Sequence, residues 1–191
     1  PTLRAANSRL AILAGGGGGV EIRANHVEID GLKFSKSGGG GGVQCYWEQH
    51  HIRVRNCEMD GGSDHGIAAL GGEFYTFEGN YVHGQRYSDY WSAISIYQGR
   101  NVTGDTTTPG FRNIIRNNIC DDNYQTGGWH TDGNGIIVDD FYHTQSGSFN
   151  FATWSGVVYP YPTLIEQNLC TRHGGRGVHV FVSAHVTVRN N

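Results

Sequence analysis

A short run of alternating apolar and polar residues that ends near an asparagine or a glycine recurs along this chain. Each run is followed, after a turn, by a second short apolar strand that begins directly after Gly or Ala. The corners of successive runs are marked by Gly31, Asn56, Asn80, Asn118, Asn168 and Asn190, at intervals of 25, 24, 38, 50 and 22 residues. A repeat of this length is typical of a solenoid. The short intervals predict one turn of 22–25 residues, and the long ones predict one turn with an insertion.

The alternation predicts which side chains the coils bury, because every second residue of a strand lies on the same face. Asn and Gly at a recurring corner tolerate left-handed backbone, and stacked Asn side chains can bond to their copies in neighbouring coils. An antiparallel sandwich with ordinary turn asparagines remains the alternative, although Asn-Gly hairpin signals are almost missing. We expect two inward columns, with Tyr97, Ile137 and Phe181 facing outward: Val43/Ile67/Ile94/Ile136/Val178 and Cys45/Ala69/Ile96/Val138/Val180.

Composition limits the classes of partner. The chain has 191 residues, 37% of them hydrophobic, and 30 glycines, which favours strands and turns over helices. A formal charge of −3 with scattered Lys and Arg argues against a surface that binds nucleic acid. The sequence contains no run of eighteen apolar residues, so it predicts no membrane-spanning helix. We expect one domain over residues 1–191, acting as a monomer. Because polar caps are missing at both ends, we expect this domain to be a fragment or the ordered core of a longer chain.

Two further features bear on the coils. Cys120 and Cys170 each follow a corner Asn by two residues, so they should occupy the same position in neighbouring coils. Parallel Cβ directions favour free buried thiols there, with a disulfide as the alternative. The runs Gly15 to Gly19 and Gly38 to Gly42 predict loops that join two strands of a coil, and their equal length favours an artificial origin.

Polar side chains gather where the coils approach their second strand. Stacking should align these segments along one edge as a column of Asp64/His65, Arg86/Asp89, His130/Asp132 and Arg172/His173/Arg176. Tyr90, Trp91 and Trp129 add flat apolar faces suited to stacking on sugar rings. The competing interpretation is that each His or Asp is a turn residue that bonds to backbone. Four coils that supply such groups to one edge favour a functional groove.

An acidic segment suggests a calcium site, and we leave the metal open. Asp132, Asn134, Asp139 and Asp140 offer oxygen ligands. The spacing is not that of an EF-hand, and alternation places Asp132 and Asp139 at opposite ends of a strand, which argues against one shared ion. A solvated Asp139–Asp140 pair at a turn is the preferred interpretation.

The coil pattern, the corner asparagines and segments such as Asp132–Asp140 and Gly174–Phe181 resemble the right-handed parallel β-helix proteins, which include pectate and alginate lyases and polygalacturonases. This resemblance implies an all-β fold, a single right-handed parallel β-helix of about six to seven coils with essentially no helix. It also implies a secreted or extracellular protein that acts on a polysaccharide. His130-Thr131-Asp132-Gly133 looks like the Asn-Thr-Asp-Gly of polygalacturonases, but the Asp pair that follows here, Asp139-Asp140, comes too soon after it. The sequence also departs from the pattern of the lyases, because its only lysines, Lys33 and Lys36, lie far from the polar column.

The first functional hypothesis is a polysaccharide lyase that acts on an acidic glycan. Arg86, Arg172 and Arg176 would bind the sugar carboxylates, while His130 or His65, held by Asp132 or Asp64, would remove the proton. A hydrolase would instead use Asp89 and Asp132 as a facing pair of carboxylic acids. The third hypothesis is a non-catalytic glycan-binding or structural solenoid in which Trp91 and Trp129 carry the affinity.

Overall fold

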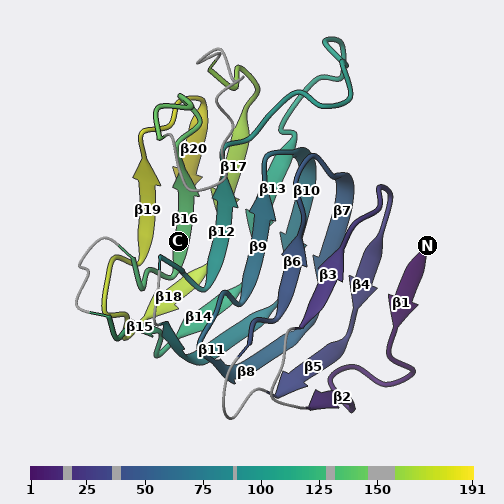
Figure 1. The fold of residues 1–191 in the computed structure, drawn as a ribbon, viewed down its shortest axis with the longest axis vertical. Helices are drawn as coiled ribbons and strands as arrows, with labels where there is room; N and C mark the ends of the chain where they lie inside the picture. Colours follow the sequence, from purple (N-terminus) through teal and green to yellow (C-terminus); the bar gives the residue numbers. More distant parts are fainter. Residues whose placement is uncertain (15–18, 36–39, 88–89, 128–131, 146–157) are drawn as a thin grey trace.

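Three parallel β-sheets wind through the computed structural model, which describes residues 1–14, 19–35, 40–87, 90–127, 132–145 and 158–191 (Figure 1). The first sheet consists of β1 (Thr2–Arg4), β4 (Glu28–Asp30), β7 (His50–Arg55), β10 (Glu73–Glu78), β13 (Asn113–Arg116), β17 (Thr163–Glu166) and β20 (Val186–Arg189). The second consists of β2 (Ala11–Ala14), β5 (Leu32–Ser35), β8 (Glu58–Gly62), β11 (Tyr81–Tyr87), β14 (Ile119–Asp121) and β18 (Leu169–Thr171), with β15 (Tyr124–Gln125) beside the end of β11. The third consists of β3 (Val20–Ile22), β6 (Val43–Cys45), β9 (Ile67–Leu70), β12 (Ile94–Tyr97), β16 (Ile136–Asp139) and β19 (Val178–Phe181).

All strand pairs are parallel, and the described residues contain no helix, so none that could span a membrane. Seven strands in the first sheet and six in the third confirm a solenoid of six to seven coils. The antiparallel sandwich is excluded, because β12 and β16 pair in parallel with Ile94 opposite Ile136. Each coil has three strands where the sequence pattern indicated two, since a left-handed residue at the corner divides each predicted first run between the first and second sheets.

The predicted register of the two columns of the third sheet is confirmed, and the predicted burial is confirmed for the members in β6, β9, β12 and β16. Val43, Ile67, Ile94, Ile136 and Val178 are in register, as are Cys45, Ala69, Ile96, Val138 and Val180. The members in β6, β9, β12 and β16 are fully buried, whereas Val180 is 38% exposed because β19 is the edge strand of its sheet. Ile137 pairs with Ser95 outside the core cluster, as alternation predicts for an outward position.

The corner asparagines belong to two adjacent columns, which corrects the single column expected from the sequence. The left-handed residues are Gly31, Asn56, Gly79, Asn117, Gln167 and Asn190, all with φ between 53° and 72°, at intervals of 25, 23, 38, 50 and 23 residues. The hydrogen-bonded ladder lies one residue later, and its members are Asn80, Asn118, Asn168 and Asn191. At each corner, one residue therefore adopts the left-handed backbone, and the residue after it forms the side-chain hydrogen bonds of the ladder.

The residue before β3, β6, β9 and β16 is a glycine because the next coil passes too close for a Cβ. A Cβ on Gly42 would lie 2.2 Å from the carbonyl oxygen of Gly66, and one on Gly66 would lie 2.5 Å from that of Ala93. Gly19 precedes β3 at the same position, and a Cβ there would meet the backbone of Gly42. The last glycine of each five-glycine run therefore has a packing requirement of its own. Gly15–Gly18, Gly38 and Gly39 lie outside the described residues.

Candidate functional site: a polar edge and a groove on the first sheet

The predicted polar edge lies at the corner between the second and third sheets. Backbone hydrogen bonds stack this corner from coil to coil: the N–H of Gly133 donates to the carbonyl of Trp91 over 2.9 Å, and the N–H of Gly175 donates to that of Gly133 over 3.0 Å. The segments at this corner carry His65, Tyr90, Trp91, Asp132, His173 and Arg176, and Tyr90 is 58% exposed. Asp89, Trp129 and His130 lie outside the described residues. The catalytic and sugar-binding roles assigned to this edge stay predictions.

Two of the predicted carboxylate-binding arginines bind carboxylates of this chain. Arg86 donates to a side-chain oxygen of Asp122 over 3.0 Å, and its guanidinium lies 4.9 Å from the centre of the Tyr124 ring. Arg172 donates from Nε to Oδ1 of Asp121 over 2.8 Å and from Nη2 to the second oxygen. The hydrogen bonds from Arg172 lower the pKa of Asp121. An acidic ligand at either arginine must therefore displace a partner that is already in place.

His65 is buried at the edge and held by its neighbour in sequence. Its Nδ1 lies 2.8 Å from Oδ1 of Asp64, and its ring lies 4.9 Å from that of Trp91. Only 4% of His65 is exposed, and a Cβ on Gly41 would lie 2.8 Å from the ring. Burial raises the pKa of Asp64, but the hydrogen bonds from the ring and the backbone N–H of His65, together with the charge of that ring, lower the pKa overall. This arrangement provides the predicted Asp-oriented histidine, and places its ring beneath the surface.

The two stacked cysteines and His173 form a second polar group at the same corner. Cys120 and Cys170 are opposite each other in β14 and β18, as predicted, and both are free thiols. A Cβ on Gly135 would lie 2.6 Å from Nε2 of His173 and 2.9 Å from Sγ of Cys170, so the ring and the thiol are near neighbours. Hydrogen bonding with Cys120 lowers the pKa of Cys170 to about 6, against the opposing effect of burial.

The acidic segment is more buried than the sequence indicated. Asp140 is fully buried and accepts hydrogen bonds from Thr144, Gln145 and Gln98, so the expected solvated Asp pair is wrong. Burial, and then the charges of Asp132 and Asp140, raises the pKa of Asp139 to about 7. The oxygen atoms of Asp140 are committed to its turn, and a calcium ion at Asp132 or Asp139 stays a prediction.

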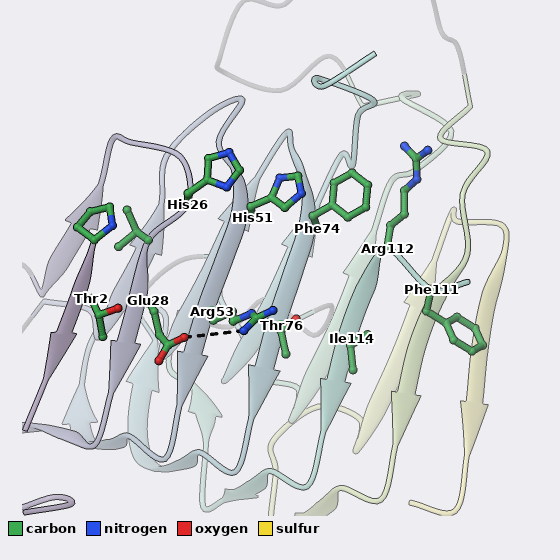
Figure 2. A pocket seen from close by; sticks show the side chains of 12 residues that line it. Thr2, His26, Glu28, His51, Arg53, Phe74, Thr76, Phe111, Arg112 and Ile114 are labelled. Atoms are coloured by element: carbon green, nitrogen blue, oxygen red, sulfur yellow. Dashed lines mark ion pairs between the residues drawn. The ribbon is translucent and has the colours of Figure 1, made fainter. Parts of the chain in front are cut away.

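A groove on the outer face of the first sheet was not predicted from the sequence. It has a volume of about 350 Å³, and its side chains come from neighbouring coils (Figure 2). The floor is one outward column with one residue per strand across β1, β4, β7, β10 and β13: Thr2, Glu28, Arg53, Thr76 and Ile114. The wall lies two residues earlier in each strand register and consists of His26, His51, Phe74 and Arg112, with Phe111 beyond. The groove therefore runs along the solenoid axis, across the strands.

The wall is a stack of flat rings on left-handed backbone. His26, His51 and Phe74 have φ values of 57°, 56° and 57°. The ring centres of His26 and His51 are 4.6 Å apart, and those of His51 and Phe74 are 4.5 Å apart. The spacing of His26 from His51, 25 residues, equals the first interval of the corner repeat. This equality is the signal in the sequence that points to the wall.

The accessible charge of the groove is positive. Arg53 is 62% exposed, and its nearest carboxylate, Glu28, lies 4.0 Å away. Glu28 is shared with Arg4 and Arg55, at 2.9 and 2.8 Å. Arg112 also lines the groove, but it is fully buried and its charge is compensated by Glu73 at 2.6 Å. Arg53 is therefore the cation that the floor offers to a ligand.

The comparisons with known proteins identify the fold family. A family model described as "right handed beta helix region" matches residues 7–109, a segment that contains β2 to β12. No curated protein and no solved structure matches the chain. Because the matched segment is more than half of the chain and its strands stack in three parallel sheets, this protein belongs to the right-handed β-helix family.

Proposed function

We propose that this β-helix binds an acidic polysaccharide along the groove of the first sheet. The observation that carries the proposal is the groove itself, with an exposed and incompletely paired Arg53 on its floor and a wall of stacked rings. Guanidinium groups recognise carboxylates and sulfates with paired hydrogen bonds, and a flat apolar face such as that of Phe111 suits a sugar ring. Such polymers lie outside cells, so an extracellular location is part of the proposal.

The repeating construction favours a polymer over a single small molecule. Each coil contributes one floor residue, and neighbouring coils are about 4.8 Å apart, so five strands offer a path roughly 20 Å long. The path is lined by side chains of different type, with hydroxyl groups from Thr2 and Thr76 beside the charge of Arg53. A chain of sugar units can place one group against each of these positions.

The test is binding of polygalacturonate, alginate and heparin to the wild-type protein, to Arg53→Gln and to Arg189→Gln by isothermal titration calorimetry. Arg189 is a matched control, because its side chain is 54% exposed on the same sheet and pairs with Glu166, away from the groove. We expect Arg53→Gln to weaken binding of at least one polymer about tenfold, the loss of one charged hydrogen-bonded contact. Binding by none of the polymers, or equal loss in both variants, would refute the proposal.

A second candidate is β-elimination at the polar edge, favoured by one observation there. Arg176 is exposed, and among the described residues no carboxylate pairs with it. A guanidinium without a carboxylate partner can neutralise the carboxylate of a uronate, which is one component that elimination requires, and His130, the base predicted from the sequence, would supply the other. We expect absorbance of an unsaturated product on incubation with a uronate polymer, lost in Arg176→Gln. Release of new reducing ends without that absorbance would indicate hydrolysis instead.

A further inference from the structure

We propose that His26, His50 and His51 together bind a late first-row divalent cation, with Zn²⁺ as the defining probe. One ring nitrogen from each of the three side chains lies within 4.8 Å of the others. Imidazole nitrogen is a preferred ligand of zinc, copper and nickel, whereas calcium and magnesium require oxygen. This site is independent of the glycan proposal, because it needs no sugar contact.

The backbone positions these histidines from two adjacent coils. The N–H of His26 donates to the carbonyl of His50 over 3.1 Å, and the N–H of His50 donates to Oδ1 of Asn25 over 3.0 Å. The left-handed conformation at His26 and His51 directs both side chains to the same side, so their rings stack with an interplanar angle of 23°. The ring of His50 stands nearly perpendicular to both, at 89° and 79°.

The ring nitrogens already approach the separations that a metal imposes. Nδ1 of His50 and Nδ1 of His51 are 2.8 Å apart, so in the metal-free protein one imidazole donates its N–H to the lone pair of the other. Two nitrogens on one tetrahedral zinc lie about 3.3 Å apart, because each bond is about 2.0–2.1 Å long. The pair at 2.8 Å therefore has to open by roughly half an ångström, and any separation near the 4.8 Å limit has to contract by about 1.5 Å, which rotation of the exposed His26 and His51 side chains allows.

The cation would have a coordination position open to the groove. His26 and His51 are exposed and line its wall, and three protein ligands with one open position are the arrangement of zinc sites that bind a further ligand. The competing interpretation is that the histidines only form a stack that continues to Phe74, since the distance from His51 to Phe74 matches that from His26 to His51. The stack does not require His50, whereas the metal site does.

The experiment is equilibrium dialysis of the untagged chain against Zn²⁺, with metal content measured by plasma mass spectrometry. We expect one zinc ion per chain in the wild type and an affinity at least about tenfold weaker in His26→Asn, His50→Ala and His51→Asn, because each variant removes a direct ligand. Asparagine is chosen at His26 and His51 because it tolerates their left-handed backbone. Circular dichroism checks that each variant keeps its β-structure.

His185→Asn is the matched control. His185 is exposed, has a φ of 57° and precedes β20 at the register position that His51 occupies before Ile52, but at the far end of the first sheet. Equal weakening in this variant, or no zinc retained by the wild type, would overturn the proposal.

A measurement on the wild type alone gives a second test, which needs no variant to fold. During a zinc titration followed by nuclear magnetic resonance, imidazole shifts should be confined to three of the ten histidines of the chain. Shifts spread over the other histidines would also reject the site. Neither experiment contains a glycan, so failure here leaves the groove proposal standing, and failure of the glycan titration leaves this one standing.

Discussion

At the scale of single residues, the buried asparagine ladder joins neighbouring coils through side-chain hydrogen bonds. Oδ1 of Asn118 accepts from both the backbone N–H and the side-chain amide of Asn80, at 3.0 Å each. The Nδ2 of Asn118 donates to Oδ1 of Asn168 over 2.9 Å and to the carbonyl of Phe77 over 3.0 Å. One side chain therefore satisfies polar groups in the coils on both sides of it.

Asn118→Ala should lower the free energy of unfolding by about 2–4 kcal/mol, because it leaves buried donors of Asn80 without an acceptor. Urea denaturation followed by circular dichroism measures the change. The control is Asn117→Gly, at the adjacent exposed position with φ 56°, where glycine fits the backbone and the change should stay within about 0.5 kcal/mol. If the two variants unfold at the same urea concentration, the ladder makes no special contribution.

At the scale of elements, one buried ion pair attaches the long segment between β12 and β13 to the first sheet. Arg112 and Glu73, both fully buried, are 2.6 Å apart, and Glu73 also accepts from the hydroxyl and the N–H of Thr103. Arg112 donates to the carbonyl of Asp105 as well, and its guanidinium lies 3.3 Å from the centre of the Tyr161 ring. This insertion is therefore held by charge rather than by strand pairing.

Arg112→Met should destabilise the protein by about 3–5 kcal/mol, because it leaves the Glu73 carboxylate buried without its cation. Arg116→Met is the control: Arg116 pairs with Glu78 on the same sheet, but its side chain is 40% exposed, so its loss should cost less than about 1 kcal/mol. Calorimetric melting of the two variants separates them. A similar melting temperature for both would show that the Arg112 pair contributes no more than a surface pair.

At the scale of the whole molecule, groups with opposite pKa shifts govern the dependence of stability on pH. Carboxyl groups such as Asp30 and Asp121 have lowered pKa values, so their contribution is lost when the pH falls. Burial also lowers the pKa of His143 and His179, whose contribution is likewise lost in acid. Asp139 has the opposite sign, because its pKa in the folded state is raised to about 7.

Asp139→Asn should therefore stabilise the protein at pH 8 and have little effect at pH 4. In the wild type, the folded state holds a proton on Asp139 that the unfolded state releases near pH 4, so stability is lost as the pH rises from about 4 to about 7. The difference between variant and wild type should grow over that window to at most about 4 kcal/mol. Because the variant and the wild type share all other titratable groups, the contributions of the histidines and the other carboxyl groups cancel when the two free energies of unfolding are subtracted. A difference that is constant from pH 4 to pH 8 would contradict the raised pKa.

The sequence alone determined the repeat of the coils and the two inward columns of the third sheet. Burial every second residue and a tight corner every 22–25 residues are local demands, so the residue pattern is enough to place Val43, Ile67 and Ile94 in register. The same reasoning aligned Cys120 with Cys170. The same reasoning assigned the left-handed corner to Asn80, Asn118 and Asn168, one residue too late. The error arose because asparagine is favoured both in left-handed backbone and in a hydrogen-bonded ladder.

Only the tertiary structure decided which polar side chains are available to a ligand. Arg86 and Arg172 are indistinguishable from Arg53 in the sequence, yet the first two bind Asp122 and Asp121 while Arg53 borders a groove. Such pairing depends on which residue of the next coil lies alongside, and insertions of variable length between strands change that alignment. The groove and the histidine cluster arise for the same reason: residues about 25 positions apart become neighbours only when the coils stack at about 4.8 Å.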